Sequence, residues 1–462
     1  MSDTEVTPLI PKRGRKWVHV YAIIAAIGGF ICGYDTGSIS SIVALPVFQE
    51  RFFLDGSVAY YQSILLASYL VTSMLGAFFS GYFCDGIGRK RSMLVSCGLL
   101  SLGISFQLIG IDAMTLFLGR LMGGIGTGLM TNAIPLYQSE IAPPDIRGRL
   151  ISIFSLLCSF GQMVGYFITF GTSYLSTSDW SWRLPWLFQL ICCFLYAISL
   201  TFLPYSPRWL IDQGRETEAI EILTDLHNSS LVAHRDYLEI KTSPQQKDCD
   251  FIELFQGSNR KRTLYAFFIS VATCFTGNVV ISYYAPEIFK DAGLDDVSIS
   301  LALTGGIGLL SLVFTACSLR WWIDRWGRKV LFMTGSVISG VCMLVVGLMF
   351  EYRHLKGTQP VIIVCIYVFS ASFAGTWGVA NYVYTAEVFS TACRAKGLSL
   401  TYAISWACSI TITYCTPYAL SYTISGVYFF LAACSILTVI GITWIPELKG
   451  KTLEQIDYML SQ

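Results

Sequence analysis

The chain has 462 residues, of which 54% are hydrophobic and 13% are charged, and its formal net charge is +1. Soluble globular proteins carry about 25% charged residues, so soluble domains of this length could not bury so much apolar surface. The near-zero net charge gives no reason to expect a nucleic-acid partner. The composition therefore excludes a soluble protein and indicates a chain embedded in a lipid bilayer.

Apolar runs follow one another along the chain, each near or above the ~20 residues that a helix needs to cross ~30 Å of hydrocarbon. Segments in lipid must pair their own backbone groups, so we predict helices rather than open strands. The separating loops around residues 112 and 422 are short. The twelve predicted spans are 17–44, 60–83, 92–111, 113–136, 150–172, 185–203, 263–285, 299–322, 330–350, 360–386, 395–420 and 424–445.

The spans form two groups of six, divided by one long polar stretch. This stretch contains ETEAIEILTDL, which has a helical pattern and no apolar run, so we predict short helices in it. The predicted fold is an all-α membrane protein. Its parts are a tail at 1–16, a six-helix bundle at 17–203, a linker at 204–262, a second six-helix bundle at 263–445 and a tail at 446–462.

Lysine and arginine gather on the side of the bundle that carries both tails and the linker. Four of them lie within 12–16, ahead of the first span, and others follow on alternate loops of the same side. By the positive-inside rule, both termini and the linker are predicted to be cytoplasmic. The opposite side has five basic residues: Arg51, Arg183, Lys290, Arg353 and Lys356.

Three motifs occur twice, once in each bundle and in the same order. Asp-x-x-Gly-Arg-Lys stands at 85–90 and at 324–329. Tyr-x-x-Glu, with Arg seven residues after the Glu, stands at 137–147 and at 384–394. The third pair is PYSPRWL and PELKGKTL, at the end of each bundle. The two bundles are therefore predicted to be structural duplicates.

The repeated motifs put acidic and basic side chains on the cytoplasmic face of both bundles. Charge-assisted hydrogen bonds among them could fasten the two halves together on the inside. Exposed ion pairs contribute only ~0–1 kcal/mol each, so such a network would close one state without locking it. The alternative, that basic loops simply stay inside, leaves the fixed carboxylate spacing unexplained. The predicted gate residues are Asp85, Arg89, Glu140, Arg147, Asp324, Arg328, Glu387, Arg394 and Glu447.

The run GGIGTG at 123–128 mimics a dinucleotide-binding loop, but no strand precedes it. We predict instead that Gly124 and Gly128 let two helices approach closely. The four histidines are scattered without metal-ligand spacing, and most cysteines lie inside spans as small packing residues. We therefore expect no metal site and no cofactor.

In combination these motifs resemble the sugar porter family of the major facilitator superfamily, and most closely its fungal members. The resemblance runs from end to end and implies two six-helix bundles that rock around a site near the bilayer midplane. Further stretches that carry it are GGFICGYDTGSIS at 28–40, GRLMGGIGTG at 119–128, PLYQSEIAPPDIRG at 135–148, YYAPEIF at 283–289 and PELKGKTLEQID at 446–457.

Asp35 and Arg120 are ionisable residues inside predicted spans, where such groups indicate function. The resemblance implies that Asp35 takes up a proton and that Arg120 tunes it, because burial and a charged partner both shift a carboxyl pKa. The alternative is a static buried ion pair that fixes helix packing.

A polyhydroxylated solute needs many hydrogen-bond partners, because an unpaired buried polar group costs ~1–3 kcal/mol. The family's seventh span has a Gln-Gln pair, and Thr273 and Cys274 stand in its place; Asn278 lies one position before the family asparagine. The cavity is thus predicted to have lost several amides, and glucose is not carried over as the substrate. The predicted substrate residues are Gln162, Thr273, Cys274, Asn278, Tyr283, Trp377, Tyr382 and Ser405, with Tyr284 as a further aromatic candidate.

The resemblance implies a transporter of a sugar or similar polyhydroxylated solute, with proton symport as a further implication. The alternative is a non-transporting nutrient sensor of the same fold. An enzyme is not expected, because no nucleophile–base or metal constellation is present. We expect a monomer in the plasma membrane. The pattern EVTPLI at 5–10 has the form of an acidic-dileucine sorting signal, so the vacuolar or endosomal membrane is the alternative location.

Overall fold

A computed structural model describes residues 12–53, 58–143, 146–175, 177–227, 229–242, 251–294, 296–353, 357–390, 393–449 and 459. Within these ranges the regular structure is helical, and twelve helices are long and apolar enough to cross a membrane. The prediction of an all-α protein with twelve spans is confirmed. The side chains of Arg147 and Asp324, and the pattern EVTPLI, lie outside the described part.

The first six spans are single helices, and a short helix α2 (Pro46–Phe52) follows the first of them. The loop near residue 112 is a real break, because Gly110 ends one helix in the left-handed region and the Asp112 side chain accepts a hydrogen bond from Thr115 N. The spans are α1 (Lys12–Ile42), α3 (Val58–Ile87), α4 (Arg89–Ile109), α5 (Ala113–Ile141), α6 (Arg147–Ser173) and α7 (Trp180–Thr201).

The second six spans contain more interruptions. The elements are α11 (Gly257–Thr273), η2 (Cys274–Asn278), α12 (Val279–Asp291), α13 (Val297–Cys317), η3 (Ser318–Trp322), α14 (Ile323–Trp326), α15 (Arg328–Glu351), α16 (Thr358–Gly375), α17 (Trp377–Val388), α18 (Arg394–Tyr422) and α19 (Ile424–Ile442). Elements α11, η2 and α12 together form the seventh span, and α16 and α17 the tenth. A single residue, Thr423, separates the last two spans and caps α19.

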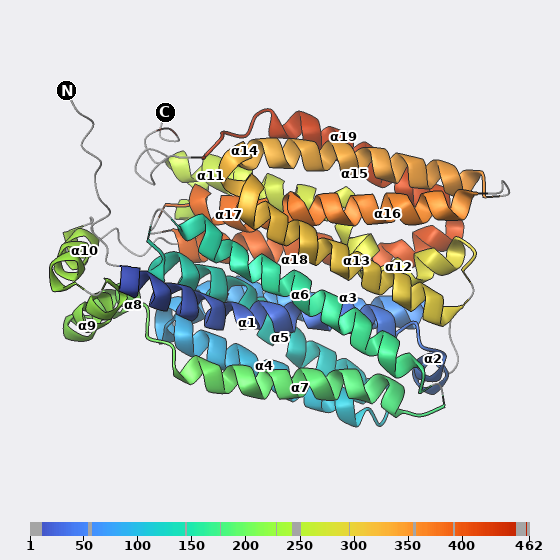
Figure 1. The fold of residues 1–462 in the computed structure, drawn as a ribbon, viewed down its shortest axis with the longest axis horizontal. Helices are drawn as coiled ribbons and strands as arrows, with labels where there is room; N and C mark the ends of the chain where they lie inside the picture. Colours follow the sequence, from blue (N-terminus) through green and yellow to red (C-terminus); the bar gives the residue numbers. More distant parts are fainter. Residues whose placement is uncertain are drawn as a thin grey trace.

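The two halves lie side by side with their helices nearly parallel (Figure 1). They meet mainly where α3 packs against α18 and α6 against α13. The short helices α8 (Pro207–Asp212), α9 (Glu216–His227) and α10 (Ser230–Thr242) sit together at one end, which we call the linker end. The predicted short helices between the bundles are thus present.

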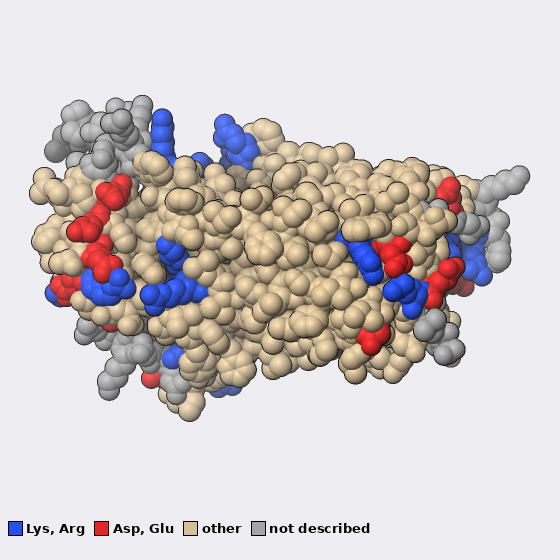
Figure 2. Space-filling model, turned by 90° about the horizontal axis from the view of Figure 1, so that it is seen from below, with Lys and Arg blue, Asp and Glu red and all other residues tan. Residues whose placement is uncertain are grey.

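Charged side chains gather toward the two ends of the molecule. Figure 2 shows this on one face, where a broad band without Lys, Arg, Asp or Glu lies between the charged ends. A band of this kind suits the hydrocarbon layer of a membrane, because charged side chains are costly there.

Each copy of Asp-x-x-Gly-Arg-Lys forms the same sharp turn between two spans. Gly88 and Gly327 both have a φ of 87°, and each directly precedes the helix that starts with the motif's Arg. Side chains disfavour this left-handed conformation, so the turn requires glycine. The repeated glycine therefore has a backbone cause that is the same in both halves.

The seventh and tenth spans are both broken. Gly277, inside η2, has a φ of 106°, and Thr376, between α16 and α17, has a φ of −118° and a ψ of −82°. Broken helices free backbone groups and are tolerated in membranes where they line a cavity. Both breaks border the cavity described below.

Candidate functional site

A cavity of about 250 Å³ lies between the two halves. Helices of both halves contribute to its wall, which consists of hydroxyls, amides, thiols and aromatic rings. Among the described residues that line it, none is charged.

The structure brings all eight predicted substrate residues to the wall of this cavity. Gln162 of α6 donates to the Tyr166 hydroxyl at 2.9 Å, and Tyr166 in turn donates to Ser282 O at 3.0 Å. This chain of hydrogen bonds crosses from the first half to the second. The eight residues are Gln162, Thr273, Cys274, Asn278, Tyr283, Trp377, Tyr382 and Ser405.

Cys274 lies on the cavity wall and faces α18. Its Sγ lies 3.4 Å from Ser405 O and 3.5 Å from the Ser409 hydroxyl. Two small polar groups, a thiol and a hydroxyl, therefore face each other at this part of the wall.

The predicted aromatic residues play different parts. Trp377 lines the cavity, but its indole N–H donates to the Ser336 hydroxyl at 3.2 Å and its ring packs on Phe332. Tyr284 does not line the cavity; its hydroxyl donates to Thr413 O at 2.7 Å in the core of the second half. The expectation of a cavity face for Tyr284 was therefore wrong, because one step along a helix turns a side chain by ~100°.

Several cavity residues were missed from the sequence. Asn381 precedes Tyr382 in α17 and brings an amide to the wall, and Tyr69 of α3 brings a ring from the first half. An asparagine inside an apolar span was a signal that could have singled out Asn381. Others that sequence reasoning missed are Thr36, Thr127, Thr131, Tyr402 and Trp406.

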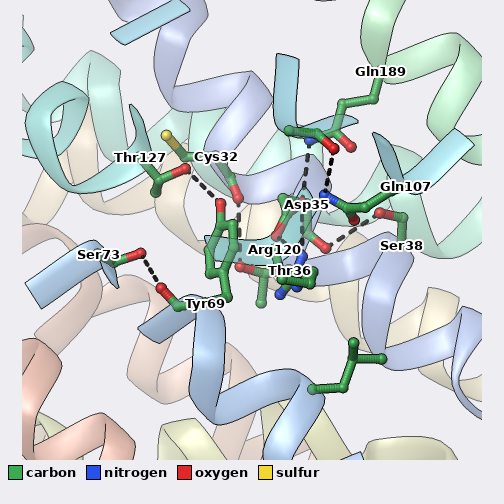
Figure 3. Close-up of polar contacts among 12 residues, drawn as sticks. Cys32, Asp35, Thr36, Ser38, Tyr69, Ser73, Gln107, Arg120, Thr127 and Gln189 are labelled. Atoms are coloured by element: carbon green, nitrogen blue, oxygen red, sulfur yellow. Dashed lines mark hydrogen bonds and ion pairs between the residues drawn. The ribbon is translucent and has the colours of Figure 1, made fainter. Parts of the chain in front are cut away.

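Asp35 and Arg120 form a buried ion pair beside the cavity. Arg120 Nη1 lies 2.9 and 3.1 Å from the two Asp35 carboxylate oxygens, and the residues are 2% and 1% exposed (Figure 3). Gln189 of α7 donates from Nε2 to Asp35 Oδ1 at 3.4 Å, a partner that sequence reasoning missed. A buried carboxylate with a guanidinium and an amide as partners can hold its charge, and loss of that charge would release the guanidinium.

The predicted gate residues form matched ion pairs at the linker end. Arg89 Nη2 lies 2.8 Å from Glu140 Oε1 and 3.2 Å from Asp85 Oδ1. In the second half, Arg328 Nη2 lies 2.9 Å from Glu387 Oε1. Each of these pairs joins residues of the same half.

The remaining described gate residues support helix ends. Glu447 accepts hydrogen bonds from Arg328 N at 3.1 Å and Lys329 N at 2.9 Å, and so caps α15. Arg394 is 4% exposed, and its Nη2 donates to Phe389 O at 3.5 Å.

Side chains of the two halves meet on both sides of the cavity. Toward the linker end, Asn132 donates from Nδ2 to Ala395 O at 3.4 Å, and Lys396 Nζ lies 5.7 Å from the centre of the Tyr82 ring. Away from that end, α1 packs against α12, and Thr36 and Tyr283 of these helices both line the cavity. Two halves that close on a polar cavity from either side define a membrane transporter that works by alternating access.

Comparison with known proteins agrees with this class. The family described as sugar (and other) transporter matches residues 21–460. The chain belongs to this family, a branch of the major facilitator superfamily, and is a transporter rather than an enzyme.

The relatives are fungal permeases and a bacterial symporter. A probable quinate permease of Aspergillus niger is 30% identical over 97% of this chain and 88% of its own length, and the quinate permease of Neurospora africana is 28% identical over 98% and 90%. The proton:xylose symporter XylE bound to 6-bromo-6-deoxy-D-glucose has a TM-score of 0.86, 25% identity, and coverage of 96% and 99%. None of these supports the sensor alternative.

The fold agrees less well with an inward-open structure of XylE. The inward-open conformation of XylE from E. coli has a TM-score of 0.76, with 25% identity and coverage of 96% and 99%. This lower agreement fits the contacts between Asn132 and Ala395 and between Lys396 and Tyr82, which join the halves at the linker end.

Proposed function

We propose that this transporter carries a neutral polyhydroxylated solute, a sugar or a polyol, in symport with protons. The uncharged wall of the cavity carries the first part of the proposal. Three amides, Gln162, Asn278 and Asn381, and several hydroxyls supply hydrogen-bond partners. The rings of Tyr283 and Tyr382 supply apolar faces.

Quinate, the substrate named for the fungal relatives, is the alternative. It carries a carboxylate, and a buried anion without a cationic partner is strongly disfavoured. Arg120 lies against the ring of Tyr69, a residue of the cavity wall, and both oxygens of Asp35 compensate its charge. The electrostatics of the cavity therefore favour an uncharged sugar or polyol over a solute that carries a carboxylate, such as quinate.

Proton coupling is supported by the position of Asp35. The carboxylate is buried next to the cavity, and its two partners, Arg120 and Gln189, come from two other helices of the same half. Neutralising Asp35 would release three helices from one shared contact. That release can favour the rocking of the halves that exposes the solute on the other side.

We further propose that the linker end faces the cytoplasm, in agreement with the positive-inside rule. The pairs Arg89–Glu140 and Arg328–Glu387 would then stiffen the inner end of each half, and the closed state would rest on contacts between the stiffened ends. The plasma membrane is the proposed location, with the protein acting as a monomer.

An uptake panel in proteoliposomes tests the proposal. Labelled xylose, glucose, myo-inositol and quinate are each offered with and without an inward proton gradient. We expect a neutral solute to accumulate only with the gradient, and Asp35→Asn to abolish accumulation while leaving exchange of the solute. Preferential uptake of quinate would refute the neutral class, and full accumulation by Asp35→Asn would refute the coupling role.

A further inference from the structure

The aromatic ring of Tyr69 lies against the guanidinium of Arg120. The distance from Arg120 Cζ to the centre of the ring is 3.9 Å, and both side chains are buried, with 2% and 1% exposure. A cation over the face of an aromatic ring is attracted by the ring's quadrupole, and the attraction is stronger when both groups are removed from water. Arg120 therefore has two partners of opposite character, a carboxylate and a ring.

The position of this ring is fixed by helix packing. A Cβ atom on Gly124 would lie 2.3 Å from Tyr69 O, and one on Gly128 would lie 2.1 Å from Ser73 O. These glycines allow α5 to contact the backbone of α3, as predicted from the small residues of 123–128. The Tyr69 hydroxyl is also held, because it is hydrogen-bonded to Thr127 Oγ1 at 2.5 Å (Figure 3).

The ring matters most when Asp35 is neutral. Arg120 Nε and Nη2 have no hydrogen-bond partner among the described residues, and Nη1 is bonded to Asp35. A proton on Asp35 removes the negative charge that compensates this buried guanidinium, and a buried cation without a counter-charge is strongly disfavoured. The ring of Tyr69 is then the partner that still offers negative potential.

The other groups around Asp35 do not replace the ring. Cys32 and Tyr34 of α1 itself lie near enough to interact with the Asp35 charge, and Tyr283 of α12 interacts with both Arg120 and Asp35. Gln189 of α7 is neutral, and from α6 the titratable Cys158 lies on the cavity wall. Among these described groups Arg120 is the one cation, so the charge state of Asp35 acts chiefly on Arg120.

We infer that Tyr69 is a positioning residue for proton coupling, whose ring stabilises Arg120 while Asp35 carries the proton. This inference rests on the proposed proton symport. The ring favours the protonated state more than the ionised state, because in the ionised state the carboxylate already compensates the guanidinium. The same ring forms part of the cavity wall, so that a bound solute contacts the residue that holds Arg120.

Infrared titration of the full-length protein in lipid tests the inference without any solute. The absorption band of a protonated carboxyl group is followed against pH, and the part lost in Asp35→Asn is assigned to Asp35. We expect Tyr69→Leu to move the midpoint to lower pH by about one unit, a roughly ten-fold weaker binding of the proton. Tyr69→Phe keeps the ring and should leave the midpoint within about 0.3 units.

The outcomes separate the inference from the proposed function. An unchanged midpoint in folded Tyr69→Leu, with a normal Asp35 band in the wild type, overturns the role of Tyr69 alone. Absence of any band that Asp35→Asn removes overturns proton coupling and the inference together. If Tyr69→Leu does not fold, Tyr69→Met, which also lacks an aromatic ring, must shift the midpoint in the same direction; no shift overturns the inference.

Discussion

Arg89 and Glu140 form an ion pair at the end of two neighbouring spans, with 2.8 Å between Nη2 and Oε1 and side chains only 7% and 5% exposed. Glu140 also accepts a hydrogen bond from the Ser206 hydroxyl at 2.6 Å, at the start of α8. One carboxylate thus joins the turn after α3, the end of α5 and the start of the linker. The related pair Arg328–Glu387 is more open, at 8% and 19% exposure.

These exposures predict a ranking of stability losses. Removing one partner of a buried ion pair costs ~3–5 kcal/mol, whereas an exposed pair contributes ~0–1 kcal/mol. We expect Glu140→Gln to lower the Tm most, Glu387→Gln less, and Asp85→Asn least, because the Asp85 side chain is 40% exposed. Thermal unfolding of the purified variants measures the order. A loss in Asp85→Asn equal to that in Glu140→Gln would contradict the ranking.

The glycine of each repeated turn should resist substitution. Gly88→Ala and Gly327→Ala place a side chain at a φ of 87°, which costs ~1–2 kcal/mol. At Gly327 the new Cβ would also lie 2.7 Å from the Glu447 carboxylate that caps α15. Gly86→Ala is the matched control, because no atom lies within 4 Å of its Cβ position. Equal expression and Tm for all three variants would show that the turn tolerates a side chain.

The two halves differ where the first has Tyr205 and the second has Glu447. In the third repeated motif, Tyr205 of PYSPRWL stands where PELKGKTL has Glu447, so the first half lacks this carboxylate. In the structure its ring lies 5.3 Å from Lys90 Nζ, 5.8 Å from Arg91 Cζ and 5.6 Å from Arg215 Cζ. The position thus keeps favourable contacts with cations through the face of the ring.

We therefore expect Tyr205→Ala to destabilise the linker end and Tyr205→Glu to restore or exceed the wild-type stability. A carboxylate there would meet the first turn of α4, as Glu447 meets that of α15, and such caps contribute ~0.5–2 kcal/mol. The rate of hydrogen exchange of the first amides of α4 measures how well position 205 stabilises this helix end. Faster exchange in Tyr205→Glu than in Tyr205→Ala would rule out the capping role.

The spans, the duplicated motifs and the eight cavity residues could be predicted because each has a signal in the sequence. Tyr69 and Gln189 could not, because an aromatic or amide residue in a span usually packs, and lipid and protein core are equally apolar. Hydropathy therefore does not show which face of α3 or α7 points inward.

Two further features needed the three-dimensional structure. The breaks at Gly277 and Thr376 lie inside continuous apolar stretches. Hydropathy alone therefore predicts an uninterrupted helix at both positions. The partners of the gate residues were also hidden, because the spacing of a repeat fixes a motif within its half and not the contact it makes. Arg89 and Arg328 accordingly pair with carboxylates of their own halves.

The linker should respond to acid pH through Glu216. Tyr237 and Lys241 of α10 donate hydrogen bonds to its carboxylate, and they lower the pKa of Glu216 below its ordinary value. A lowered pKa means that the contribution is present above the ordinary pKa and is lost as pH falls through the lower, folded-state value. We expect the protection of α9 and α10 against hydrogen exchange, measured relative to the intrinsic amide rate at each pH, to fall as pH drops below the ordinary carboxyl pKa of ~4.3. Glu216→Gln should remove this pH step; a step that persists would assign it to another group.

Modification of the Cys274 thiol can test whether the solute binds in the cavity. Its thiol lies between α11 and α18 and lines the cavity wall, so a small membrane-permeant thiol reagent that reaches it would fill space meant for the solute. We expect methyl methanethiosulfonate to inhibit uptake in the wild type and the transported solute to protect against it. Cys274→Ser should keep uptake and lose most of the sensitivity, since serine preserves a small polar group facing Ser409. Cys32→Ser and Cys158→Ser are the controls from the same wall; unchanged inhibition in Cys274→Ser with loss in either control would move the sensitive position to the first half.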